Sequence, residues 1–88
     1  MSMEDIIRYL VGVKYEAEKR LKAKISFSYM EAEDTATFKV YFPELKKLCL
    51  VDINDIQLKM HRGEPTSNIG REVSTKAIDF VFSLVKNW

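Results

Sequence analysis

Alternating hydrophobic and polar residues predict a β-hairpin between positions 24 and 42. The alternation runs from Lys24 to Tyr29 and resumes from Thr35 to Phe42, after the polar break at residues 31–34. Because successive side chains of a strand point to opposite faces, each run places its large apolar groups on one side. A two-stranded ribbon is marginal in water, so the rest of the chain must cover that side.

Two segments flank the hairpin region with the three- and four-residue spacing of amphipathic helices. The first, about residues 3–22, follows Ser2, a suitable capping residue. The second runs from about 71 to 86, and its apolar side carries Val73, Ala77, Phe80, Val81, Leu84 and Trp88. Ile78, Phe82 and Val85 widen the apolar surface of this helix to roughly 200°, which exceeds what covering one sheet requires.

The segments between the hairpin and the last helix are harder to assign. Residues 44–52 fit either a helical turn opened by Pro43 or a short buried strand, and we favour the strand because 52–55 has the composition of a turn. Ile56, Leu58 and Met60 alternate with polar residues, which indicates a further strand. Residues 62–70 are polar and flexible and predict the longest connection without secondary structure.

These elements predict one α+β domain over residues 1–88. Two helices, about 3–22 and 71–86, are expected to pack on one face of a three- or four-stranded antiparallel sheet. The element order is α-β-β-β-(β)-α. A chain of this length buries only about 60 to 65% of its unfolded surface, so its stability should be modest.

Composition and charge indicate the cellular compartment of the protein but not its function. The net charge of +1 creates no global field toward nucleic acid or an acidic membrane. Cys49 is the only cysteine, so an internal disulfide is impossible and a reducing compartment is expected. The apolar run 6–11 is interrupted by Arg8 and does not read as a signal peptide, and no segment approaches the roughly 20 apolar residues of a membrane span. We expect a cytoplasmic protein that does not associate with membranes.

No residue pattern indicates catalysis. His61 is the only histidine, and neither a nucleophile nor an orienting partner is fixed beside it. Cys49 reads as a small buried hydrophobic residue, and the acidic segment 31–34 lacks the spacing of a calcium loop. We therefore expect no enzymatic activity, no cofactor and no metal.

The apolar surplus of the last helix indicates protein interaction. Large exposed apolar patches are uncommon on soluble monomers, and closed two-fold dimers are the commonest assemblies. We expect a homo-oligomer or a protein partner; the alternative is that the two helices bury these groups against each other. The predicted interface consists of Val11, Tyr15, Ile78, Phe82 and Val85.

A basic cluster gives a second hypothesis, nucleic-acid binding. Lys19, Arg20, Lys22 and Lys24 lie at the end of the first helix and could contact phosphates. The helix-strand-strand-strand-helix order is similar to that of double-stranded RNA-binding domains. Those domains carry a lysine-rich segment at the start of the final helix, whereas residues 70–76 contain only Arg71 and Lys76 with Glu72 between them. The alternative reading of the cluster is a solvated helix end.

The connection into the last helix gives a third hypothesis, an anion site. Backbone N–H groups at a helix start favour negative charge, and nearby side chains could supplement them. The glycines of this segment lack the spacing of a phosphate-binding loop, so a mobile surface connection is the alternative. The candidate residues are Arg62, Ser67, Asn68 and Arg71.

Overall fold

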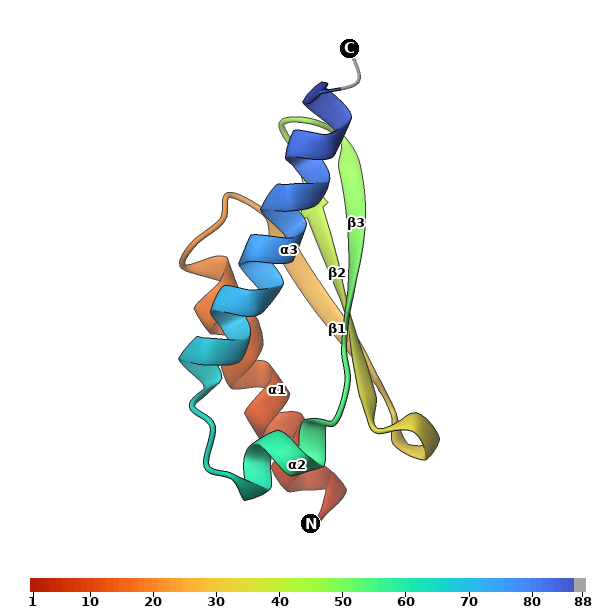
Figure 1. Ribbon diagram of the computed structural model, residues 1–88, viewed down its shortest axis with the longest axis vertical. Coiled ribbons are helices and arrows are strands. Elements are labelled where there is room, and N and C mark those ends of the chain that lie inside the picture. Colours follow the sequence, from red (N-terminus) through yellow and green to blue (C-terminus); the bar gives the residue numbers. More distant parts are fainter. Residues whose placement is uncertain (87–88) are drawn as a thin grey trace.

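A computed structural model describes residues 1–86, and within them the chain forms three α-helices and one three-stranded antiparallel sheet (Figure 1). The elements are α1 Met3–Glu18, β1 Lys24–Met30, the 3-10 turn η1 Glu31–Glu33, β2 Thr35–Phe42, β3 Lys47–Ile53, α2 Ile56–His61 and α3 Thr66–Lys86. The predicted α+β class and the α-β-β-β-α order are confirmed.

The sheet has the strand order β1-β2-β3, and its register follows the predicted alternation. Phe27 lies opposite Phe38, which in turn lies opposite Val51, and these three side chains point toward the helices. Figure 1 shows α1 and α3 on the same side of the sheet, so the other face of the sheet is not covered by a helix. Of the segment 44–52, residues 47–52 belong to β3, so the predicted strand is confirmed there, while residues 44–46 form the turn that precedes it.

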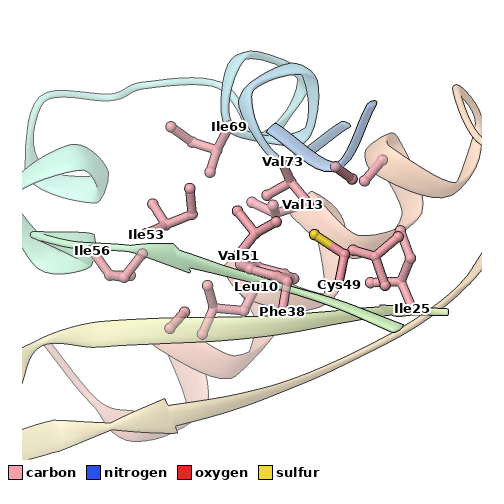
Figure 2. Close-up of a cluster of buried hydrophobic side chains, with 14 of the residues drawn as sticks. Leu10, Val13, Ile25, Phe38, Cys49, Val51, Ile53, Ile56, Ile69 and Val73 are labelled. Carbon is pink, nitrogen blue, oxygen red and sulfur yellow. The ribbon is translucent and has the colours of Figure 1, made fainter. Parts of the chain in front are cut away.

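The core lies between this sheet and the two long helices (Figure 2). Phe38 and Leu10 are among its largest fully buried side chains, and β3 contributes Val51 and Ile53. Cys49 is 5% exposed and belongs to the same cluster, as its sequence context predicted. Burial of these apolar groups is the main stabilising contribution, at about 25 cal/mol per Å² removed from water.

Two glycines let α1 and α3 approach closely. A Cβ atom on Gly70 would lie 2.5 Å from Glu16 Cβ, and one on Gly12 would lie 2.9 Å from Thr66 Cγ2. Both contacts advance by four residues in the same direction, so the two helices run parallel. Because α1 ends at Glu18, the C-terminal half of α3 continues past it, and Figure 1 shows this half (blue) extending beyond the end of α1.

The first helix is shorter than predicted. It ends at Glu18, not near residue 22, and Lys19 is its C-terminal capping residue. The N–H of Arg20 donates to the carbonyl of Ala17 at 3.0 Å, which closes a tight final turn. Leu21 and Ala23 then pack against the core from the connection to β1, so the apolar periodicity continues after the helix itself has ended.

The predicted strand at 56–61 is wrong, because these residues form the short helix α2. Ile56 is fully buried and Met60, one turn later, packs against the core, while Leu58 is exposed. Ile56 and Met60 are four residues apart, which places them on one face of a helix, and the alternation at 56, 58 and 60 fits a strand equally well. The N–H of Ile56 donates to the backbone carbonyl of Asp34, and the N–H of Gln57 donates to the Asp34 carboxylate, which stabilises the start of the helix.

The last helix begins earlier than predicted, at Thr66 rather than at 71. Pro65 stands directly before it, a position where the missing N–H costs nothing. Ile69 and Gly70 are buried, so residues placed in a flexible connection belong to the core. Trp88, assigned above to the apolar side of this helix, lies outside the described residues. Within residues 1–86, no helix is long and apolar enough to cross a lipid bilayer.

Candidate functional site

Exposed apolar side chains gather at the end of the molecule where α3 extends past α1. Phe82 is 67% exposed, Val85 61% and Ile78 38%, although all three belong to one well-formed helix. Leu45, in the turn between β2 and β3, is 49% exposed and lies beside the same part of α3. We call these four residues, Leu45, Ile78, Phe82 and Val85, the distal apolar surface.

The three α3 residues of this surface form a continuous seam. They are spaced by four and three residues, which confines them to about 60° of the helix circumference at 100° per residue. The spacing matches the seam that a second helix would cover in a coiled-coil contact. The buried side of α3, with Val73 and Ala77, points in a different direction, so the seam is additional to the core contact.

A hollow of about 260 Å³ separates the β2–β3 turn from α3. Val81, Leu84 and Val85 line it from the helix, and residues 44, 45 and 47 line it from the turn. Val81 and Leu84 are only half-buried there, whereas the equivalent positions nearer the middle of α3 are fully buried. The chain's own turn therefore does not close the core at this end.

The two predicted interface residues of α1 lie apart from this surface. Val11 is half-buried, and Tyr15 is 56% exposed with the Lys14 Nζ atom 5.1 Å from its ring centroid. Tyr15 is next to Glu16, which contacts Gly70, and Phe82 lies twelve residues further along α3. At 1.5 Å per residue this separation is about 18 Å, so the predicted interface divides into two sites.

The basic cluster is partly neutralised. Lys19 Nζ lies 3.1 Å and an Arg20 guanidinium nitrogen 3.2 Å from the carboxylate of Glu16. Hydrogen bonds from these two side chains lower the pKa of Glu16, which keeps the carboxylate charged. Within residues 1–86, Lys22 and Lys24 form no ion pair.

Lys24 belongs to the uncovered face of the sheet instead of the helix end. It lies opposite Tyr41, and Ser26 lies opposite Lys39. These four residues and Leu48 line a shallow hollow of about 310 Å³. The structure therefore places Lys19 and Arg20 beside Glu16 at the helix end, Lys22 in the connection to β1, and Lys24 on the uncovered sheet face near Lys39.

The predicted anion site does not exist as a loop. Arg62 caps the C-terminal end of α2, while Ser67, Asn68 and Arg71 lie in the first two turns of α3. The N–H of Asn68 donates to the carbonyl of Pro65 at 3.0 Å, so it is already satisfied. The helix start lies at Thr66 and Ile69 is buried, so the segment is not the mobile surface connection that was the alternative, and anion binding by these four residues stays a prediction.

A polar network that the sequence did not indicate connects the hairpin tip with α2. Asp34 accepts hydrogen bonds from the Tyr29 hydroxyl at 2.6 Å and from the N–H of Gln57 at 3.1 and 3.2 Å. Burial and the Asp34 carboxylate raise the pKa of Tyr29. Asp34 adopts a left-handed conformation, with φ of 49°, that aspartate tolerates well. The network joins Asp34 and Gln57, which are 23 residues apart in sequence, and its role is to hold the hairpin tip against the start of α2.

The groups most often used in catalysis are dispersed. His61 is exposed at the end of α2, and burial raises the pKa of the Cys49 thiol, which disfavours the reactive thiolate. The part of the chain that the structure describes contains no group of three His, Cys, Asp or Glu side chains able to hold a metal ion. The distal apolar surface is therefore the feature that most needs a functional explanation.

Comparisons with protein-family models, with curated proteins and with solved structures find no match. The assignment of function therefore depends on the geometry of the described residues.

Proposed function

We propose that this protein is a small non-enzymatic interaction module that self-associates through the distal apolar surface. The observation that carries the proposal is the exposure of Ile78, Phe82 and Val85 on the part of α3 that extends past α1. Phenylalanine and valine side chains each gain about 1.5–3 kcal/mol from full burial. A helix that presents such residues in one seam is stabilised when a partner covers them.

The size and shape of the chain support this proposal. Its accessible surface is 5836 Å², compared with about 5,400 Å² for a compact monomer of this mass. The molecule measures 45 × 24 × 18 Å, and α3 contributes to the long dimension. Covering one end of an elongated small domain removes surface that its own core is too small to cover.

The uncovered sheet face is a weaker candidate for this contact. It also exposes apolar residues, including Leu48 and Leu50. Leu48 lies opposite Tyr41, but Leu50 lies opposite Lys39, and the next pair along the strands is Thr37 with Asp52, so the apolar part of this face is confined to one end. An antiparallel sheet commonly leaves one face in water, whereas an uncovered apolar helix seam is less common.

Self-association is tested by the mass of the protein in solution. The unmodified chain is expected to elute in light-scattering chromatography at twice its 10.3 kDa chain mass. Phe82→Asp places a carboxylate in the middle of the seam and is expected to give a monomer. The control is Leu58→Asp, because Leu58 is 45% exposed on α2, away from this surface, and its substitution should leave the dimer intact. A folded Phe82→Asp variant with unchanged mass would refute the proposal.

Nucleic-acid binding remains a second candidate because Lys24 and Lys39 border a hollow on the uncovered sheet face and form no ion pair in the described chain. Phosphate contacts made by a few lysines weaken steeply with salt. Binding to a mixed nucleic-acid pool should then fall between 50 and 200 mM salt and should be lost in Lys24→Glu. Salt-independent or absent binding would exclude this candidate.

A further inference from the structure

We infer that the partner on the distal apolar surface is a second copy of this chain, with the two α3 helices antiparallel across a two-fold axis at Phe82. This inference rests on the proposed function and specifies its geometry. A two-fold contact uses the same patch on both subunits, so the patch must be complementary to itself. Around Phe82, both the apolar side chains and the charged side chains of α3 are arranged so that they complement the same side chains of a second copy.

The apolar residues are arranged symmetrically about Phe82. Ile78 precedes it by four residues and Val85 follows it by three. In an antiparallel pair centred on Phe82, Ile78 of one copy therefore lies level with Val85 of the other, and the two Phe82 rings meet at the centre. Each exposed apolar side chain of the seam then contacts an apolar side chain of the partner helix, which is the packing found in helical seams.

The charges beside the seam reverse from one end to the other. Asp79 is exposed before Phe82 and Lys86 is exposed after it, and both lie on the same edge of the seam at 100° per residue. Within the described chain neither forms an ion pair. Antiparallel pairing places each Asp79 beside the other copy's Lys86, whereas parallel pairing places like residues level with each other. The charge pattern therefore selects the antiparallel arrangement.

Leu45 extends the same contact toward the sheet. It lines the hollow under Val85, on the opposite edge of the seam from Asp79 and Lys86. A second copy lying along the seam covers this edge as well, so the interface has an apolar centre and one charged edge. That composition is typical of a protein interface with a buried core and a polar rim.

Spin-label distances test the orientation directly. A nitroxide is attached to a cysteine introduced by Ser83→Cys or by Thr75→Cys, because both positions are exposed on α3. The background is Cys49→Ala, and its fold is checked by circular dichroism. Antiparallel pairing separates the two Ser83 positions by about 3 Å along the helix axis and the two Thr75 positions by about 21 Å. A parallel dimer would give similar distances at both sites and would overturn the antiparallel pairing while leaving self-association intact. A protein that is monomeric at labelling concentrations would refute the proposed function itself.

Charge exchange provides an independent test. Asp79→Lys and Lys86→Asp each create two like-charge pairs per dimer, and each is expected to weaken self-association about tenfold. Mixing the two variants restores opposite charges in both pairs, so the mixed dimer should form with nearly the unmodified affinity. If the mixture associates no better than either variant alone, the Asp79–Lys86 pairing is wrong. Lys76→Glu, on the same helix but paired with Glu72, is the matched control and should not change the affinity.

Discussion

Asp34 illustrates how one side chain can hold two distant connections in place. Its carboxylate accepts from the Gln57 N–H at the start of α2 and from the Tyr29 hydroxyl on β1. α2 has only six residues, and its own capping position, Asp55, makes no side-chain hydrogen bond to it. Helices this short are unstable in isolation, so the hydrogen bonds from the hairpin tip, together with the burial of Ile56, stabilise residues 56–61 as a helix.

Replacing Asp34 by alanine is expected to destabilise the protein by about 1–2 kcal/mol, because the Gln57 N–H at the start of α2 and the Tyr29 hydroxyl lose the carboxylate that accepts their hydrogen bonds. Asp55→Ala is the matched control: Asp55 also has a left-handed backbone, with φ of 56°, so alanine is similarly strained there, but no cap is lost. Urea unfolding of both variants measures the difference. Equal losses of stability would show that the backbone conformation, and not the carboxylate, is responsible.

Two partly buried tyrosine hydroxyls make the free energy of unfolding depend on pH in the alkaline range. Burial and nearby carboxylates raise the pKa of Tyr9, which donates to the Glu64 carbonyl at 2.8 Å, and of Tyr29. The folded state holds these protons more tightly than the unfolded state, so their contribution is complete below the unfolded tyrosine pKa of about 10 and is lost as pH rises through the folded values.

Unfolding free energy measured from pH 8 to 11 should therefore fall at the alkaline end. The fall should be smaller in a Tyr9→Phe, Tyr29→Phe double variant, after correction for its lower stability at pH 8. Burial also raises the pKa of Cys49, so both proteins are compared in a Cys49→Ala background. An identical slope with and without the two hydroxyls would exclude them as the cause.

At the scale of elements, the contact between α1 and α3 determines the shape of the molecule. The two glycines at this contact lack side chains, so the backbones of the parallel helices α1 and α3 can approach closely. The relative position of the two helices places the end of α1 beside the first third of α3. The remaining two-thirds of α3 packs over β3 and then extends past the core. The distal apolar surface is thus a direct consequence of where α1 stops.

Gly70→Ala is expected to destabilise the protein by about 2 kcal/mol, since the new methyl group would overlap Glu16 Cβ at 2.5 Å and approach the backbone N of Ala17 at 3.0 Å. Gly12→Ala should cost less, because its methyl group meets the Thr66 side chain and not backbone. Thermal unfolding of the two variants ranks them. A Gly70→Ala protein as stable as the unmodified chain would mean that the helices do not approach this closely.

Local pattern was sufficient for the elements whose periodicity was long and unbroken. The hairpin from 24 to 42 and the apolar surplus of the last helix follow from such runs, and both lie where the alternation and the helical spacing place them. Residues 56–61 were assigned wrongly because six residues with apolar groups at every second position also place Ile56 and Met60 one helical turn apart. The deciding interaction comes from Asp34, which no local pattern reveals.

The elements that carry the predicted site residues were misjudged for similar reasons. Ser67 and Asn68 read as a loop because small polar residues are common in connections, yet Pro65 before them and the pair Ile69 and Val73 after them indicate a helix. Tyr15 was grouped with Phe82 because the relative positions of α1 and α3 depend on Gly12 and Gly70, whose partners are tertiary. The Ile78, Phe82 and Val85 part of the interface remains a prediction, now with a defined geometry.

The whole molecule is an elongated domain with a closed core at one end and an open apolar surface at the other. Hydrogen bonds of Asp34 with Gln57 and of Tyr9 with Glu64 connect the elements at the closed end. At the open end, the β2–β3 turn lies beside α3 and a hollow remains between them. Pairing of two copies through the open end would place the two closed ends at opposite extremes of the dimer. Each uncovered sheet face would remain available for a further partner.

The concentration dependence of the solution mass of the unmodified chain tests the central claim most directly. Sedimentation velocity across a thousandfold dilution should show a dimer that dissociates to a 10.3 kDa monomer at the lowest concentrations. A single 10.3 kDa species throughout, in a protein whose fold is intact, would contradict the account.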